Sequence, residues 1–261
     1  MNKGIAFLMY HELELPGVEL CDDSAGYRRY VVSQDKFKSQ LAMIESNGWR
    51  GWNVSEALRV MNSDRETEQG LCITFDDGCA TDLSAAAPLL LEKKFNATFY
   101  ITVDHLGRRG YLTKSELREL ASLGFEIGSH SMTHRHLNDL EFSDVTVELG
   151  ESKKKLEDIT GASVRHFSCP GGRVDARVEQ VARETGYNSV VTSRIGLNTR
   201  TTNRYGLARI AVKENTSTAT LAKLCQGQGL FLSQAQNAAL SAAKRVLGNS
   251  FYERVRAATL R

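Results

Sequence analysis

Two short motifs in the sequence combine side chains that suit metal-assisted hydrolysis. The motif TFDDG carries the adjacent carboxylates of Asp76 and Asp77 at the end of an apolar run. The motif HSMTH spaces His130 and His134 four positions apart, and one helical turn would bring both imidazoles to the same face. Two imidazoles and one carboxylate can hold a divalent ion and leave a position open for water, as catalytic zinc sites require.

The two aspartates can then divide the work between them. A free carboxylate, with a pKa of about 3.9, cannot usefully deprotonate water, whose pKa is about 15.7. A divalent ion lowers the pKa of the water bound to it to about 7. One carboxylate can then ligate the ion while its neighbour takes the proton. Each motif alone is more typical of a turn or of a solvated helix face. Both motifs together, each directly after a strand-like run, favour a hydrolytic metal site.

The segments that must position these side chains alternate between strand and helix patterns. Short apolar runs at 5–10, 71–75, 97–102, 125–128, 166–168, 189–192 and 207–212 predict strands, and amphipathic stretches at 35–47, 83–93, 115–123, 144–160 and 175–185 predict helices. This order indicates parallel βα units, in either an open doubly wound sheet or a closed barrel. Reactive residues at strand ends fit both, because both folds place their sites at the carboxyl ends of strands.

Composition limits the class of protein. The chain has 261 residues, 41% apolar and 25% charged, which is enough for one core, so we expect a single catalytic domain over 1–225. A net charge of +2 gives no reason to expect a nucleic-acid partner. The five cysteines form no CxxC pair and indicate neither a disulfide framework nor a thiolate zinc site. With no apolar run near the roughly 18 residues of a membrane span, the expected location is cytoplasmic.

The segment 226–261 has no strand signal and is expected to form a helical tail. Leu240 and Leu247 lie on one stripe of this tail, and Lys244 and Arg254 are among its positive charges. A basic amphipathic helix of this kind can lie on an anionic membrane surface, or it can pack against the barrel. The first alternative places the protein peripherally at the inner face of the cell membrane and favours a lipid-linked or nucleotide-linked sugar as substrate.

Together, the motifs TFDDG and HSxxH, in this order and at this separation, resemble the polysaccharide deacetylase family, the carbohydrate esterases that share the NodB homology domain. The segments 96–137 and 152–172 follow the family's pattern, and the likeness extends over residues 1–212. The resemblance implies a distorted (β/α)7-type barrel. It also implies a metal-dependent hydrolase of carbohydrate metabolism or polysaccharide biosynthesis, removing an N-acetyl group from an amino sugar of a glycan, lipid-linked or nucleotide-linked saccharide.

Carried over by position, the resemblance gives Asp77, His130 and His134 as metal ligands and Asp76 as the general base. Zn²⁺ is the favoured ion, with Co²⁺, Ni²⁺, Mn²⁺ or Fe²⁺ as alternatives. A loop after the strand at 166–168 would wall the pocket and offer a backbone N–H to the oxyanion of the tetrahedral intermediate. That loop consists of Cys169, Pro170, Gly171 and Gly172.

The chain departs from the family pattern at two positions. Ser168 stands where many members carry an arginine that steadies the base, and Arg209 or Arg173 would substitute, with Arg209 favoured by its place at a late strand. No histidine follows His166, so the C-terminal histidine that protonates the leaving amine in many members is missing. The opening FLMYHE resembles a permuted branch in which an N-terminal Tyr-His supplies the acid, which assigns that role to His11.

Other functions remain open at this stage. A deformylase or an amidase acting on another carbon–nitrogen bond would use the same site with a different substrate. An inactive carbohydrate-binding relative is a further alternative, and Ser168 is its best support. The intact Asp76 and His11 argue against it, because a binding module needs neither base nor acid.

Overall fold

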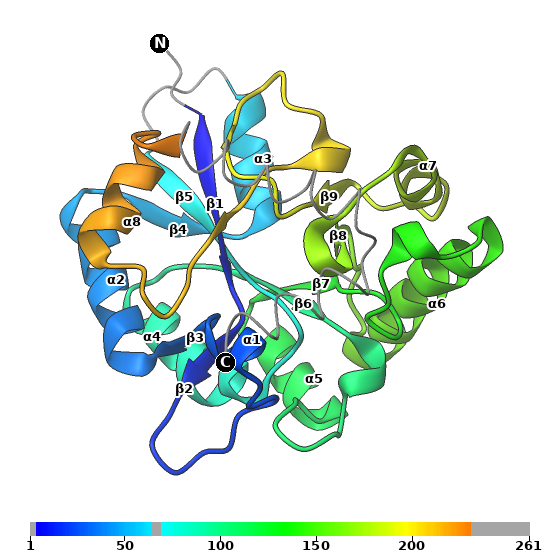
Figure 1. Cartoon of the computed structure of the whole chain (residues 1–261), viewed down its shortest axis with the longest axis horizontal. Helices are drawn as coiled ribbons and strands as arrows, with labels where there is room; N and C mark the ends of the chain where they lie inside the picture. The colour runs from blue at the N-terminus through cyan, green and yellow to red at the C-terminus, as the bar shows by residue number, and fades with distance from the viewer. Residues whose placement is uncertain (1–3, 64–68, 231–261) are drawn as a thin grey trace.

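A curled, largely parallel sheet forms the centre of the protein, with helices packed round its outside (Figure 1). The computed structural model describes residues 4–63 and 69–230. The strands are β1 (Ile5–Tyr10), β2 (Glu12–Glu14), β3 (Val31–Ser33), β4 (Arg50–Trp52), β5 (Gly70–Phe75), β6 (Thr98–Ile101), β7 (Glu126–Ser129), β8 (His166–Ser168), β9 (Ser189–Val191), β10 (Leu197–Asn198) and β11 (Ile210–Ala211). The helices are α1 (Ala25–Arg28), α2 (Gln34–Ser46), α3 (Val54–Asn62), α4 (Ala87–Glu92), α5 (Lys114–Ser122), α6 (Phe142–Thr160), α7 (Ala176–Glu184) and α8 (Thr218–Cys225).

The pairing of the strands closes the sheet on itself. The order is β10-β1-β5-β6-β7-β8-β9, with β4 also on β5 and β11 also on β1, and every pair except β1–β10 is parallel. Leu207 bridges in parallel to Val191 of β9, and β11 a few residues later pairs with β1. The segment 207–211 therefore joins the two ends of the curled sheet. The fold is the mixed α/β, distorted barrel that the resemblance implied, and the open doubly wound alternative is excluded.

Alternate residues of each strand face two different cores. In β1, Tyr10 joins the large core under the helices while Phe7 joins a smaller inner core, and in β6 Phe99 and Tyr100 divide in the same way. Under the helices, the rings of Tyr10, Phe75 and Phe99 stack with centroids 5.2 and 5.0 Å apart. Because a one-residue slip would exchange the two sets of side chains, this alternation fixes the register of the sheet.

Helix α3 covers the inner core at the amino ends of the strands. Its apolar side chains pack with Phe7 and Tyr100, and its first turn is held by Glu126, the first residue of β7. Glu126 Oε2 accepts from the amide of Val54 at 3.1 Å and from the hydroxyl of Thr98 at 2.6 Å. The amide of Ser55 donates to the same oxygen at 3.3 Å. One carboxylate therefore joins the start of α3 to two strands of the barrel.

Glu126→Gln should lower the free energy of unfolding by about 1–3 kcal/mol at pH 7, because it weakens hydrogen bonds to a buried charged group. Burial raises the pKa of Glu126, but His166, 3.4 Å away, and the hydroxyls outweigh it and hold the pKa at about 2, below its ordinary 4.5. A depressed pKa stabilises the fold above the unfolded value, and this stability is lost as the pH falls from 4.5 toward 2.

Urea unfolding at a series of pH values measures this contribution. The difference between wild type and Glu126→Gln should narrow as the medium is acidified below pH 4.5. The exposed Glu119→Gln in α5 serves as control and should change the free energy of unfolding by less than about 0.5 kcal/mol. A difference between the wild type and Glu126→Gln that does not depend on pH would contradict the assignment.

Two predicted helices begin differently in the structure. The helix predicted at 115–123 begins one residue earlier, at Lys114, because Thr113 caps it and exchanges side-chain and backbone hydrogen bonds with Glu116 in a capping box. The helix predicted at 83–93 opens with a π-helical turn, Asp82–Ala86, before α4. Pro88 has no N–H to donate back along the helix, which interrupts the regular ladder at this point.

Other elements were not predicted from the sequence. They are the strands β2, β3, β4 and β10 and the helices α1, α3 and α8. Of the tail predicted over 226–261, residues 231–261 lie outside the described residues, and 226–229 form turns after α8. In the part of the chain that the structure describes, no helix is both long and apolar enough to cross a membrane.

Candidate metal and active site

The carboxyl ends of four barrel strands bring the sequence-predicted residues together. β5 leads directly into Asp76 and Asp77, β7 into His130, and β1 into His11, while Ser168 ends β8. These strands run in parallel, so their ends meet at one rim of the barrel. The motifs that are separated in the sequence therefore share one site.

Asp77, His130 and His134 form a compact group of possible ligands. Asp77 Oδ1 lies 3.4 Å from His130 Nε2 and 3.3 Å from His134 Nε2. This oxygen is buried and has no hydrogen-bond acceptor or donor assigned to it among the described residues. His130 Nδ1 lies 2.7 Å from the carbonyl of Ser168, which can only accept, so Nδ1 carries the proton and the Nε2 lone pair faces Asp77. The donor set fits a divalent metal ion of the zinc type.

The two histidines do not lie on a helix, so the expected helical turn is wrong. Residues 131–136 form bends and loops after β7. Ser131 and His134 have left-handed φ angles of 68° and 64°, and Asp77 has 82°. Ser131 Oγ accepts from the amide of His134 at 3.0 Å, which holds the turn. Non-glycine residues in this region cost about 1–2 kcal/mol each, and such strain persists only where the surroundings fix it.

Glu148 in α6 is the main support of this turn, and the sequence analysis missed it. Its Oε2 accepts from the amides of Met132 at 2.8 Å and Thr133 at 3.0 Å, while Oε1 accepts from the Thr133 hydroxyl. Glu148 is buried on the same face of α6 as the apolar residues Val145 and Leu149. The signal that could have identified Glu148 is the presence of an acidic residue on the apolar face of a predicted helix.

Arg209 holds Asp76 in place from the segment that closes the barrel. Its NH1 lies 2.8 Å from Asp76 Oδ1 and its NH2 lies 2.7 Å from Oδ2. The remaining N–H groups donate to Thr192 O, Thr74 Oγ1 and Ser168 Oγ at 3.0, 3.1 and 2.9 Å. All the donors of the guanidinium group are therefore satisfied, with the side chain 1% exposed.

Ser168 takes part in this arrangement instead of leaving a gap. Its hydroxyl donates to Asp76 Oδ2 at 3.2 Å and accepts from Arg209. The guanidinium group beside Asp76 thus comes from residue 209, directly before β11, and a small side chain at 168 leaves room for it. Arg173 lies elsewhere, where burial lowers the pKa of His136 and the charge of Arg173 lowers it further. The structure brings Arg209 to Asp76, and not Arg173.

The charges of the site keep both aspartates ionised. Burial raises the pKa of Asp76, but the charge of Arg209 outweighs it, so the pKa lies below its usual range. Burial also raises the pKa of Asp77, but the imidazole of His134, 3.3 Å away, outweighs it, so this pKa too lies below its usual range. Burial lowers the pKa of His130 to about 4, so its imidazole is neutral at neutral pH, the form that ligates metals.

The loop after β8 keeps one backbone amide that bonds to no other group of the loop. The amide of Cys169 donates to a carbonyl of β9 at 3.3 Å, and that of Gly172 donates to Cys169 O at 2.7 Å. Pro170 has no N–H, so Gly171 has the one amide of this loop that takes no part in these hydrogen bonds. Gly171 has a φ of 66°, and a Cβ there would lie 2.7 Å from the ring of His136. Only glycine fits this position.

His11 lies beside both aspartates. The amide of Asp76 donates to the carbonyl of Tyr10 at 3.0 Å, which places the next residue, His11, at the same rim. Burial raises the pKa values of Asp76 and Asp77. The neighbouring His11 is one of the groups that lower them. The His11 ring packs on Tyr30 with centroids 4.7 Å apart, a contact that the sequence analysis missed.

Comparison with known proteins points to one family. A family model described as polysaccharide deacetylase matches residues 63–190. The Bacillus subtilis protein YxkH, named provisionally as a polysaccharide deacetylase, is 28% identical over 214 residues, which is 82% of this chain and 73% of that protein. A poly-β-1,6-N-acetyl-D-glucosamine N-deacetylase of Staphylococcus aureus is 25% identical over 202 residues, covering 72% and 70%. A peptidoglycan-N-acetylglucosamine deacetylase of Bacillus cereus is 30% identical over 151 residues, covering 58% and 64%.

Solved structures show the same barrel. The deacetylase PplD of Streptococcus pyogenes, in complex with acetate, superposes with a TM-score of 0.75 at 23% identity, covering 85% of this chain and 98% of that one. A polysaccharide deacetylase from Bacillus cereus gives 0.74 at 26% identity, covering 85% and 69%. The fold and the site define an α/β barrel with an aspartate–histidine triad at its rim. The chain resembles the polysaccharide deacetylase family over residues 63–190, and it shares the fold of solved polysaccharide deacetylases.

Arg209→Ala should lower the free energy of unfolding by about 3–5 kcal/mol, because it leaves the buried Asp76 charge without its partner. Urea unfolding at pH 7 measures the loss, and the exposed Arg118→Ala in α5 is the control. The double variant Arg209→Met with Asp76→Asn should recover part of the lost stability. If it is no more stable than Arg209→Ala, the ion pair is not what holds this part of the barrel.

Proposed function

We propose that the protein is a metal-dependent hydrolase that removes the N-acetyl group from an amino sugar of a glycan. The observation that carries this proposal is the position of Asp76, held by Arg209 beside the group formed by Asp77, His130 and His134. The relatives named as glycan N-deacetylases support the choice of bond and of substrate class.

Asp77, His130 and His134 would hold the divalent ion, and Zn²⁺ is the favoured one because two imidazoles and a carboxylate suit it. When bound, such an ion supplies Lewis acidity for the acyl carbonyl and lowers the pKa of water. The turns at Asp77 and at 131–134 set the positions of the ligands before any ion arrives. Co²⁺, Ni²⁺, Mn²⁺ or Fe²⁺ would fit the same donors.

Asp76 would act as the general base. Its low pKa keeps it ionised at neutral pH, and the two guanidinium contacts fix the plane of its carboxylate. Oδ1 accepts from Arg209 alone, so it keeps a lone pair for a proton from the attacking water. The hydroxyl of Ser168 adds a third contact at 3.2 Å, so the base is oriented before substrate binds.

Two further groups would complete the reaction. The amide of Gly171 would donate to the oxyanion as it develops, which suits a backbone N–H that no other group of its loop uses. His11 would protonate the departing amine, since an imidazole exchanges protons near neutral pH. Packing of Tyr30 against His11 limits the orientations of the acid.

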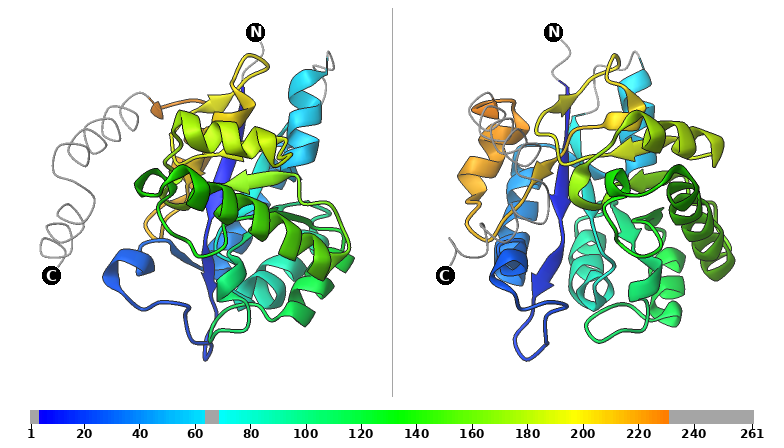
Figure 2. Two further views of the ribbon diagram at one scale, coloured as in Figure 1. Left: turned by 90° about the vertical axis from the view of Figure 1, so that its right-hand side faces the viewer. Right: turned by 45° about the vertical axis from the view of Figure 1, so that its right-hand side comes forward.

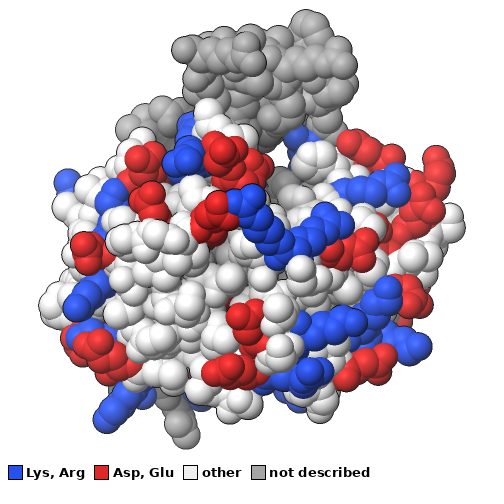
Figure 3. Space-filling model, turned by 90° about the horizontal axis from the view of Figure 1, so that it is seen from below, with Lys and Arg blue, Asp and Glu red and all other residues white. Residues whose placement is uncertain are grey.

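The face of the molecule toward which β1 runs (Figure 2) carries positive and negative side chains interspersed around an uncharged area (Figure 3). An N-acetylated amino sugar is itself uncharged, and this surface suits it. We therefore favour a sugar within a glycan over a nucleotide-linked one, whose phosphates would call for a field of positive charge. A peripheral membrane location would depend on the basic residues of the tail, which lie outside the described part of the chain.

The first test is acetate release from N-acetylglucosamine oligomers by zinc-reconstituted protein. Asp76→Asn should lower kcat by about 10²–10⁴-fold, because it removes the base, while the bound metal remains. The exposed Asp158→Asn in α6 is the matched control and should leave kcat unchanged. No release by the wild type with its metal bound would count against the proposal, and release of formate from N-formyl sugars would identify a deformylase instead.

His11→Ala should lower kcat by about 10²–10⁴-fold without loss of bound metal, because the leaving amine loses its proton donor. Metal analysis of the purified variant, with kcat expressed per bound metal ion, distinguishes a proton donor from a ligand. If the variant instead loses its metal in proportion to its activity, the role given to His11 is wrong.

A further inference from the structure

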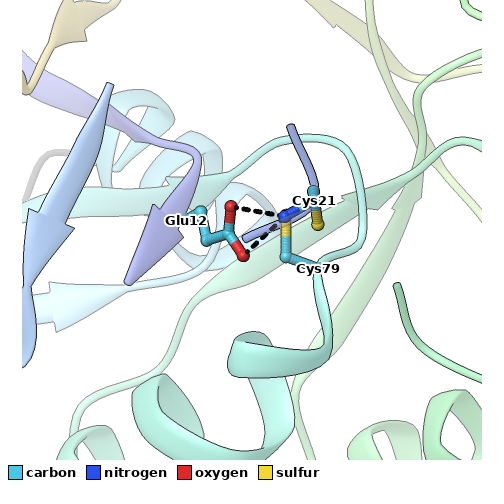
Figure 4. Close-up of side chains that lie close together, drawn as sticks. All are labelled: Glu12, Cys21 and Cys79. Carbon is cyan, nitrogen blue, oxygen red and sulfur yellow. Dashed lines mark hydrogen bonds between the residues drawn. The ribbon is translucent and has the colours of Figure 1, made fainter. Parts of the chain in front are cut away.

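A second group of ligand-type side chains lies next to the candidate active site. Glu12 of β2, Cys21 of the loop before α1 and Cys79 after β5 come from three separate segments and converge (Figure 4). Their donor atoms all lie within 4.8 Å of one another. This group shares no residue with Asp77, His130 and His134. The wide separation of the two cysteines in the sequence is the reason that no local motif revealed it.

The group lies in a region of buried acids that lack a cation. Glu12 and Asp82 are each 1% exposed, and within the described residues neither forms an ion pair with Lys, Arg or His. Asp82 Oδ2 is buried and has no hydrogen-bond partner in the same part of the chain. Burial raises the pKa of Glu12, and burial followed by the charge of Glu12 raises that of Asp82. Buried carboxylates are otherwise paired or bound to a metal ion.

We propose that Glu12, Cys21 and Cys79 form a second metal site, specific for a thiophilic divalent ion such as Zn²⁺. Two thiolates select zinc-type ions over Mg²⁺ and Ca²⁺, which prefer oxygen ligands alone. Each thiol loses its proton to solvent as its sulfur binds the ion. The ion would offset the negative charge of Glu12 in this part of the core.

The local geometry is close to what zinc needs. Tetrahedral ligands at about 2.3 Å from the ion lie about 3.8 Å apart, so the donors need to move by only about 1 Å. Glu12 meets the backbone of Cys21 through amide contacts at 3.2 and 3.1 Å, and its oxygens keep lone pairs for an ion. A fourth ligand is at hand in the carbonyl of Gly110, 2.9 Å from Cys21 Sγ, or the hydroxyl of Tyr27, 3.2 Å from Cys79 Sγ.

The ion would connect the loop before α1 to the turn that carries Asp77. Cys79 is two residues beyond Asp77, whose φ of 82° depends on the turn that both share. The site would therefore be structural and would act on the candidate active site only by fixing this turn. It is independent of the proposed deacetylation, because an inactive protein could bind this ion equally well.

Cobalt substitution tests the site without measuring activity. Metal-free full-length protein is titrated with Co²⁺, whose thiolate complexes give an intense near-ultraviolet charge-transfer absorption that carboxylate and imidazole ligands do not give. We expect this absorption in the wild type and in His134→Ala. We expect it to be lost in Cys21→Ser. The matched control is Cys225→Ser in α8, another partly buried cysteine, which should keep the absorption.

Three results would overturn the proposal. The first is cobalt binding by the wild type without the thiolate absorption. The second is an absorption that survives Cys21→Ser. The third is titration of fewer than five free thiols in denaturant, with peptide mapping that places a disulfide between Cys21 and Cys79. Cys21→Ser is the main variant because Cys21 is partly exposed, and circular dichroism checks its folding. Glu12→Gln, which keeps the shape of the side chain, should keep the absorption but weaken cobalt binding.

Discussion

The buried ion pair between Arg209 and Asp76 is the contact on which the rest of the structure depends. Arg209 lies on the segment that joins β9 to β1, and Asp76 lies at the end of β5. The segment that closes the barrel therefore also orients the carboxylate of Asp76. Taking two charges out of water costs several kcal/mol per ion, and it is offset only where every donor is satisfied. The contacts of Arg209 with Thr74, Ser168 and Thr192 meet that condition.

Neighbouring residues hold the histidines of the candidate site in place. Glu148 holds the turn of the two histidines from α6, the carbonyl of Ser168 sets the tautomer of His130, and Tyr30 packs on His11. Each supporting residue comes from a different element than the residue it supports. The local strain at Asp77 and His134 is tolerated because these contacts leave the turns no alternative conformation.

The sequence alone predicted much of the fold and of the site, and the remainder depended on long-range contacts. Asp77, His130 and His134 could be placed together because their motifs follow strands that must be parallel, and Arg209 could be favoured because it follows a late strand. The turn at Ser131 could not be foreseen, because the spacing of the two histidines also fits a helix. The contacts that hold the turn come from Glu148, in the next α-helix. Helix α3 was missed although its own sequence carries a signal, because Asn53 and Glu56 form a capping box and Val54, Ala57 and Val60 are buried on one face.

The rim of the barrel is built from both early and late parts of the chain, and this has a consequence for its biosynthesis. On the ribosome, His11 and Asp76 are made long before Arg209. A nascent barrel that closed without Arg209 would bury a carboxylate with no counter-charge, which is strongly destabilising. The growing chain should therefore stay open until the segment at 207–211 has emerged, and exposed strand edges during that delay are the kind of surface that chaperones protect.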